Sequence, residues 1–239
     1  MRPLSHTELQ TLTDCFARWD LTYSDSLAGS SLQPKTTAPI LREGRAWGAA
    51  VAAWHATGSI THATEALIHA MDEDAARLLE HGAFDRDDYQ AMRAKLDGIL
   101  THYTGSVDRL VVDSPEHEFD VPIPSRTGRR ASTRYRLQGR FDGLHTDEDG
   151  RVWIVEFKLR GRLSQLEDLV LDRQGRRYAW AWWRATGQMV AGIIYDEALN
   201  QAPQPPRVLA SGKTSSDKRQ HTTADAYLAS CQATGSTPV

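Results

Sequence analysis

"RVWIVEFKLR", residues 151–160, has the pattern of a β-strand inside a sheet, because apolar side chains occupy both of its faces. Two charged residues, Glu156 and Lys158, interrupt that pattern. Side chains alternate along a strand, so the carboxylate and the amine share one face with Ile154. A charged pair in a core strand needs either mutual compensation as an ion pair or a functional reason.

The preceding segment predicts the partner of this strand. "RYRLQGRFDGL" (134–144) has the pattern of a second strand, and "HTDEDG" (145–150) is typical of a turn, so we expect an antiparallel hairpin. If the turn is tight, Asp142 lies close to opposite Ile154 and diagonal to Glu156. Two carboxylates and an ammonium group then share a small patch at the end of a sheet.

Two carboxylates buried side by side are costly, because each raises the pKa of the other and both lose water. A divalent cation removes that cost, and carboxylate oxygens suit Mg²⁺ or Mn²⁺. A lysine beside them can orient or help to deprotonate a water, or neutralise charge on a phosphate. The competing interpretation is an ordinary ion pair on an exposed strand. The spacing alone leaves both open, although the apolar flanks favour a central strand.

The composition is that of a globular protein of one large or two small domains, with 239 residues, a hydrophobic fraction of 40% and a net charge of -3. We find no window of about 18 uncharged apolar residues and no secretory signal in "MRPLSHTELQ", so we expect a cytoplasmic protein, bacterial or phage-encoded. Residues 1–120 hold 10 Lys/Arg and 19 Asp/Glu, and residues 121–239 hold 18 and 12. The second half can therefore face a phosphate backbone, although a solvated surface explains "SRTGRRASTRYR" (125–136) as well.

Helical periodicity dominates the first hundred residues, and strands dominate the rest. The predicted helices are 4–23 with Ser5 or Thr7 as N-cap, 40–58 ending at Gly58, 61–81, 85–104, about 163–186 and a short closing helix after 222. The predicted strands are "RLVVD" (109–113), "HEFDVPI" (117–123), the two hairpin strands and "MVAGIIYD" (189–196). Residues 24–39 and 200–222 are expected to be loops, and residues 232–239 a disordered tail.

Several motifs resemble one nuclease family. "GRFDG" followed by "VWIVEFKLR" resembles the D…ExK signature of the PD-(D/E)xK nuclease superfamily, and "QGRRY" (174–178) matches the Q-x-x-x-Y motif of its RecB-like branch. That branch includes the RecB and AddAB nuclease domains and the CRISPR-associated RecB-like exonucleases. "REGRAWGAAVAAWH" (42–55) resembles its glycine-containing helix that ends in a metal-binding histidine, and residues 4–23 resemble its S-x-T-x-L…C…Y opening. The resemblance runs from about residue 4 to residue 231.

The resemblance implies a metal site and a catalytic lysine. Asp142, Glu156 and His55 are the implied side-chain ligands of Mg²⁺ or Mn²⁺, and the backbone carbonyl of Phe157 is a further one. Small residues on the helix before His55 favour close packing against the sheet, although eight other histidines compete for the role and only the motif selects this one. Lys158 is the implied catalytic cation.

The resemblance also implies contacts with DNA. Gln174 and Tyr178 are four residues apart and share a helix face, so they are expected beside the active site, where they touch DNA or steady the lysine. Arg160, Arg176 and Arg177 surround the motif and are candidate phosphate contacts. Without the resemblance, a packed tyrosine, a surface glutamine and exposed arginines explain these residues equally well.

The chain departs from many relatives in its cysteines. Those relatives hold an iron–sulfur cluster with four cysteines, whereas this sequence has only Cys15 and Cys231. We therefore expect no iron–sulfur cluster and two reduced thiols rather than a disulfide scaffold. A Walker A motif is also missing, so no helicase is expected in this chain. The protein then acts alone, as a homo-oligomer, or with a separate partner such as a recombination protein.

The sequence thus predicts an α/β fold with a PD-(D/E)xK core: a central mixed sheet flanked by helices, with a helical N-terminal part. We expect a single nuclease domain over residues 1–231, mostly helical in 1–105 and catalytic in 106–231. The predicted function is a Mg²⁺- or Mn²⁺-dependent deoxyribonuclease, an exonuclease on single- or double-stranded DNA ends in recombination, repair or phage- and CRISPR-related processing. The alternatives are an inactive DNA-binding or scaffold protein of the same fold and a restriction-type endonuclease.

Overall fold

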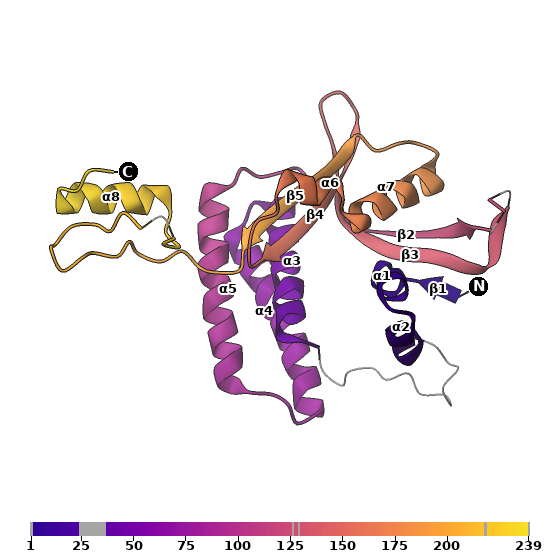
Figure 1. Cartoon of the computed structure of the whole chain (residues 1–239), viewed down its shortest axis with the longest axis horizontal. Helices are drawn as coiled ribbons and strands as arrows, with labels where there is room; N and C mark the ends of the chain where they lie inside the picture. Colours follow the sequence, from indigo (N-terminus) through magenta and orange to yellow (C-terminus); the bar gives the residue numbers. More distant parts are fainter. Residues whose placement is uncertain (1, 24–36, 126, 129, 218, 239) are drawn as a thin grey trace.

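The computed structural model describes residues 2–23, 37–125, 127–128, 130–217 and 219–238. It confirms the predicted α/β fold, with a central mixed sheet between helices (Figure 1). The elements in chain order are β1 (Arg2–Leu4), α1 (His6–Asp14), α2 (Phe16–Tyr23), α3 (Pro39–Thr57), α4 (Ile60–Glu80), α5 (Arg86–Ser106), β2 (Ser114–Pro124), β3 (Ala131–Thr146), β4 (Val152–Arg160), α6 (Leu166–Val170), α7 (Arg173–Thr186), β5 (Gly192–Leu199) and α8 (Ala224–Thr234).

Strand β4 is central, as predicted, because β3 pairs with it antiparallel and β5 pairs with it parallel. The predicted register was wrong by two residues. Leu144, not Asp142, lies opposite Ile154. The cause is a wider turn, in which the Asp147 carboxylate accepts hydrogen bonds from the Arg151 backbone N–H and the Trp153 indole N–H, both at 2.9 Å. The register, continued by one pair beyond Gly143 and Val155, places Asp142 directly opposite Glu156.

Helices α3, α4 and α5 cover one face of β4. Each is defined by its ends: Pro39 begins α3 and Gly58, with φ 68°, ends it, while the side chains of Ser59 and Asp85 cap α4 and α5. The predicted boundaries of these three helices are confirmed to within two residues. The apolar cluster under them contains Trp47, Val51, Leu67, Leu96, Leu100, Val155 and Phe157.

Helix α7 covers the other face of β4, where its Tyr178 and Ala181 pack with Phe119, Phe141 and Ile154. The single helix predicted over 163–186 was wrong, because the chain forms α6 and then restarts as α7. The Asp172 carboxylate causes the restart: it accepts hydrogen bonds from the backbone N–H groups of Gln174 and Gly175 and so caps α7.

Three other predictions differ from the structure. The N-terminal helix is interrupted at Cys15, whose backbone is extended, so Ser5 caps a shorter α1 and α2 follows. "RLVVD" (109–113) forms no strand. It runs alongside β3, where the Asp113 N–H donates to the Leu144 carbonyl and the Asp113 carboxylate accepts from the Thr146 N–H. β5 begins at Gly192 rather than residue 189. Of the loop predicted at 24–39, residues 24–36 lie outside the described residues.

The C-terminal segment extends away from the sheet and ends in α8, the predicted closing helix (Figure 1). The tail expected over residues 232–239 therefore begins within this helix, whose last turn reaches Thr234. Beyond it, the Ser236 hydroxyl accepts a hydrogen bond of 2.9 Å from the Thr214 backbone N–H. Of the cysteines, Cys15 is exposed and Cys231 is buried in α8. Among the described residues, no helix combines the length and the apolar character needed to cross a bilayer.

Candidate active site

Two carboxylates from adjacent strands meet at the end of the β3–β4 hairpin. Asp142 comes from β3, and its Oδ2 accepts a hydrogen bond of 2.9 Å from the backbone N–H of Phe157 on β4. Glu156 is only 3% exposed. Burial, with the Asp142 charge as the next cause, raises the pKa of Glu156 to about 7. Burial also raises the pKa of Asp142.

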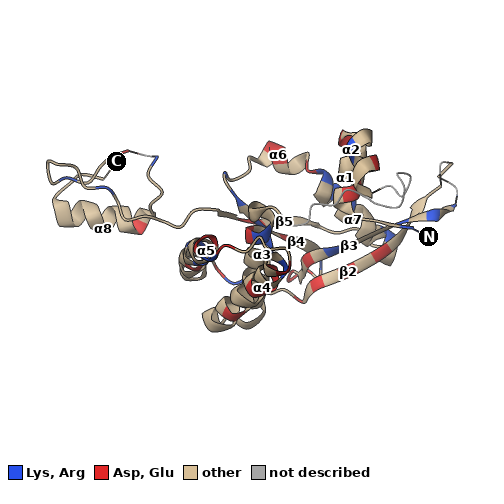
Figure 2. Ribbon diagram, turned by 90° about the horizontal axis from the view of Figure 1, so that it is seen from below, with Lys and Arg blue, Asp and Glu red and all other residues tan. Residues whose placement is uncertain are grey.

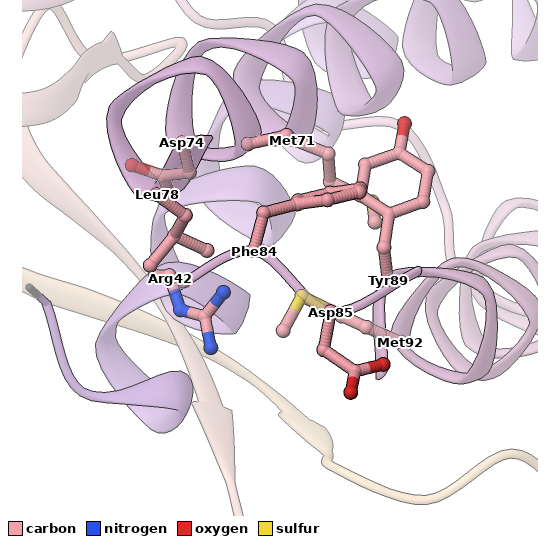
Figure 3. Close-up of a pocket in the computed structure, with 9 residues that line it drawn as sticks. Arg42, Met71, Asp74, Leu78, Phe84, Asp85, Tyr89 and Met92 are labelled. Atoms are coloured by element: carbon pink, nitrogen blue, oxygen red, sulfur yellow. The ribbon is translucent and has the colours of Figure 1, made fainter. Parts of the chain in front are cut away.

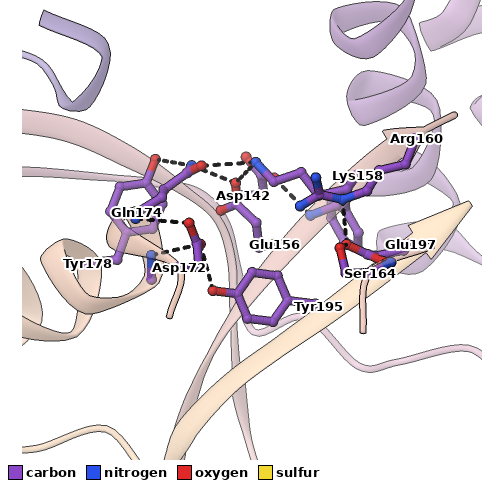
Figure 4. A network of polar contacts seen from close by, with 12 residues as sticks. Asp142, Glu156, Lys158, Arg160, Ser164, Asp172, Gln174, Tyr178, Tyr195 and Glu197 are labelled. Atoms are coloured by element: carbon purple, nitrogen blue, oxygen red, sulfur yellow. Dashed lines mark hydrogen bonds and ion pairs between the residues drawn. The ribbon is translucent and has the colours of Figure 1, made fainter. Parts of the chain in front are cut away.

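Lys158 and Gln174 surround the buried carboxylate (Figure 4). The Lys158 ammonium pairs with Glu156 Oε1 and donates to the Gln174 side-chain carbonyl at 3.0 Å. The Gln174 amide N–H groups donate to Glu156 Oε1 at 2.6 Å and to the Tyr178 hydroxyl at 3.0 Å. One polar network therefore joins Glu156, Lys158, Gln174 and Tyr178. The second carboxylate oxygen of Glu156, Oε2, is buried without any hydrogen-bond partner.

The first turn of α7 sets the position of Gln174. Besides capping this turn, Asp172 accepts a hydrogen bond of 2.7 Å from the Tyr195 hydroxyl on β5. The close approach of α7 to β5 requires a glycine at position 175, since a Cβ atom there would lie 2.3 Å from the Tyr195 oxygen and 2.6 Å from Ile193 Cδ1. Our sequence reasoning missed Asp172, although an aspartate just before a helical pattern is an N-cap signal.

We expect Gly175→Ala to lower the free energy of unfolding by about 1–3 kcal/mol, because the added methyl group overpacks the contact between α7 and β5. It also displaces Gln174 from its contacts with Glu156 and Lys158. Urea denaturation measures the first effect. The matched control is Gly105→Ala in α5, where a Cβ atom meets nothing within 4 Å. Equal stability of the two variants would contradict the tight packing of α7.

A groove of about 830 Å³ opens onto the carboxylates. One wall is the small-residue side of α3 with part of α4, and the other is the sheet, which contributes Asp142, Glu156 and Lys158. On the sheet side a second charged pair lines it, Glu116 of β2 and Arg140 of β3, whose side chains lie 3.1 Å apart, and on the helix side Arg45 and Glu73 line it. Sequence reasoning missed the pair of Glu116 and Arg140, although Arg140 stands two residues before Asp142 on the same strand.

The structure does not bring His55 to the carboxylates. Its ring is fully buried and stacks on the Phe157 ring with centroids 5.2 Å apart. Its Nδ1 accepts a hydrogen bond from the Leu110 N–H, and its Nε2 lies 2.8 Å from the Tyr103 hydroxyl and 3.2 Å from Asp196 Oδ2. Both ring nitrogens are thus engaged in the core and His55 does not line the groove, while its role as a metal ligand stays a prediction.

The three candidate arginines differ in their surroundings. Arg160 Nε donates to the Glu197 carboxylate, and Arg177 is partly buried and donates to the His6 carbonyl at 3.3 Å, which joins α7 to α1. Both guanidinium groups therefore have structural partners. Arg176 is exposed and donates to the Leu171 carbonyl at 2.8 Å, so it stays a predicted phosphate contact. Figure 2 shows the charges by element, with Asp and Glu frequent on α4.

The donor set at the groove fits a hard divalent cation. Asp142 and Glu156 supply carboxylate oxygens, and the unpartnered Glu156 Oε2 is an orphaned acceptor that a cation would satisfy. The backbone carbonyl of Phe157 stays a predicted ligand. Within the described part of the chain, no three His, Cys, Asp or Glu side chains are already gathered closely enough to hold a metal ion.

A second, much smaller cavity lies within the helical layer (Figure 3). It measures about 20 Å³, room for one water molecule, and Arg42, Asp74 and Tyr89 are among its lining residues. Arg42 Nε and Asp74 Oδ2 are buried there without hydrogen-bond partners. Its size leaves no room for a substrate. The groove is the candidate active site because Asp142, Glu156, Lys158 and Gln174 line it.

Comparison with known proteins identifies one family. The model of the PD-(D/E)XK nuclease superfamily matches residues 3–234, nearly the whole chain. A search of curated proteins gives no match. The matched range contains all of the residues that form the polar network around Glu156.

Proposed function

This chain belongs to the PD-(D/E)XK nuclease superfamily, and on that premise we propose that it is a metal-dependent deoxyribonuclease that acts as an exonuclease on DNA ends. The observation that carries the proposal is the buried, unpartnered Oε2 of Glu156 beside Asp142 at the floor of an open groove. A purely structural ion pair with Lys158 leaves that oxygen unexplained, because a buried acceptor without a partner costs about 1–3 kcal/mol.

In this proposal Asp142 and Glu156 hold Mg²⁺ or Mn²⁺, with the carbonyl of Phe157 as a further ligand. The bound cation would supply Lewis-acid activation of a water and of the scissile phosphate. The Phe157 N–H keeps Asp142 oriented toward Glu156 through its bond to Oδ2. The high pKa of Glu156, raised by burial and Asp142, means that this carboxyl loses a proton when a cation binds.

Lys158 contributes charge at the reacting phosphate. Its ammonium pairs with Glu156 Oε1 in the groove, and Gln174 holds it through a second bond of 3.0 Å. If Glu156 bound a cation in place of the Lys158 ammonium, that ammonium would be free to contact the phosphate. It would then neutralise the negative charge that develops during attack by water. Gln174 and Tyr178 position this lysine. By resemblance to the family, the products carry a 5′-phosphate.

The groove is the proposed path for DNA. Arg140 lies at its wall with a side chain that is 53% exposed, and its pairing partner Glu116 is 56% exposed, so a phosphate can compete for the guanidinium. Arg176 is a second proposed phosphate contact. The exonuclease assignment rests on the similarity of the Q-x-x-x-Y and D…ExK motifs to the RecB-like branch. A homo-oligomer or a recombination partner protein stays a prediction.

Digestion of end-labelled linear and closed circular DNA, each single- and double-stranded, tests this function. With Mg²⁺ or Mn²⁺, we expect mononucleotides or short products from linear DNA, little change in circles, and no cleavage in EDTA. Asp142→Asn is the matched inactive control, because it keeps the hydrogen bond from Phe157 but removes a charge. Cleavage of circles at the rate of linear DNA would indicate an endonuclease. Absence of any cleavage would favour the DNA-binding alternative.

A further inference from the structure

Glu116 has a backbone conformation that its place in a strand does not explain. Its φ is 50°, the only positive value of a non-glycine residue in the described ranges. Such a conformation costs on the order of 1–3 kcal/mol and persists only where the surroundings impose it. Because Pro115 pairs with Gly143 and His117 with Phe141, the register places Glu116 across from Asp142. The irregularity in β2 is thus adjacent to one of the two site carboxylates.

The Glu116 side chain belongs to the same groove as the two site carboxylates. It lines the groove together with Asp142 and Glu156 and is more than half exposed. In the present arrangement it pairs with Arg140 at 3.1 Å. An exposed pair of this kind contributes only about 0–1 kcal/mol, so exchanging partners costs little.

The cation site needs further donors. Asp142 and Glu156 provide two carboxylates, and His55, the predicted third ligand, is held in the core by Tyr103 and Leu110. Mg²⁺ and Mn²⁺ prefer six oxygen ligands, and water fills the positions that the protein leaves open. The independent sign that a ligand belongs here is the buried Glu156 Oε2, which has no hydrogen-bond partner at the groove.

We propose that Glu116 is the third carboxylate ligand of this cation and that it exchanges Arg140 for the metal when the cation binds. The inference rests on the proposed function. Since no three acidic or imidazole groups of the described residues are yet gathered around one point, the Glu116 side chain must rotate about its flexible bonds to join the others. The exchange leaves the Arg140 guanidinium free to contact a phosphate of the DNA in the groove.

Calorimetric titration with Mn²⁺, without DNA, tests the inference. We expect Glu116→Gln to weaken Mn²⁺ binding at least tenfold, since even the loss of an outer partner of a metal site costs roughly 10–100-fold. The matched control is Glu118→Gln, two residues away on the same strand and paired across the ladder with Arg140, which should bind Mn²⁺ like the parent. Asp142→Asn should abolish binding.

Glu116→Asp separates a ligand from a distant charge. It keeps the negative charge but shortens the side chain, so a ligand role predicts weakening that approaches that of Glu116→Gln. Parental affinity of Glu116→Asp beside a weak Glu116→Gln would show an effect of charge alone and overturn the inference. Parental affinity of both variants, with binding still lost in Asp142→Asn, would overturn it while the proposed function stands. Unchanged binding in all three would remove the metal site itself.

Discussion

Replacing Lys158 by methionine is expected to lower DNA cleavage by two orders of magnitude or more while DNA affinity changes little. The substitution keeps an unbranched side chain that is one atom shorter and removes the ammonium, which pairs with Glu156 and donates to Gln174. Losing one preorganised electrostatic catalyst costs roughly 10²–10³ in turnover. The affinity of a protein for DNA generally depends on several phosphate contacts, so removing one proposed contact should change it little. Single-turnover cleavage with Mg²⁺ and fluorescence anisotropy in EDTA measure the two quantities.

The matched control is Lys95→Met in α5. Lys95 also pairs with a carboxylate, Glu43, and is similarly exposed, but it lies outside the groove. Its loss should leave cleavage at the parental rate. If Lys158→Met cut DNA as fast as the parent with Mg²⁺ and with Mn²⁺, the pair on β4 would be only an intrastrand ion pair, which is the competing interpretation that the sequence allows.

Alternation along β4 explains how much of the site could be predicted. The period of two assigned Glu156 and Lys158 to one face and Phe157 to the other, and the structure agrees, since Phe157 packs under α3 while Glu156 meets α7. The helical spacing of Gln174 and Tyr178 put both on one helix face, and the family resemblance implied that this face lies beside the active site. In the structure Gln174 donates to both Glu156 and Tyr178. The alternation and the shared helix face depend only on local geometry, which a sequence specifies directly.

The errors arise where tertiary contacts decide. The small residues of α3 line the groove, but His55, near the end of the same helix, lies outside it. Its Nε2 instead contacts Tyr103 and Asp196, which are 48 and 141 residues away in the sequence. The hairpin register was missed because Asp147 closes a wider turn. No local pattern reveals that Glu116 adopts a positive φ, and its position across from Asp142 follows only from the pairing of β2 with β3.

Glu156→Gln is expected to abolish cleavage and to change the pH dependence of stability. Because burial and Asp142 raise the pKa of Glu156 from 4.5 to about 7, the folded protein keeps a proton between these values that the unfolded chain has lost. Without metal, the stability of the parent therefore falls as pH rises through this window, by roughly 3 kcal/mol at pH 8. Glutamine cannot ionise, so in EDTA the variant should match the parent near pH 5 and exceed it at pH 8.

At pH 8, Mn²⁺ should make the parent more stable than Glu156→Gln, the reverse of the order expected in EDTA. A cation that binds only the folded state stabilises it by about 4.1 kcal/mol at a thousandfold excess over Kd, and the variant lacks this gain. The gain exceeds the advantage of roughly 3 kcal/mol that the variant has at pH 8 in EDTA. Urea denaturation at pH 5 and pH 8, in EDTA and in Mn²⁺, measures all four conditions, with the exposed Glu118→Gln as control. The difference between parent and variant isolates position 156, because the other titrating groups are common to both. If this difference were independent of pH, the Glu156 carboxyl would not have the raised pKa that its burial indicates. If Mn²⁺ stabilised both proteins equally, this carboxyl would not be the metal ligand that its unpartnered oxygen indicates.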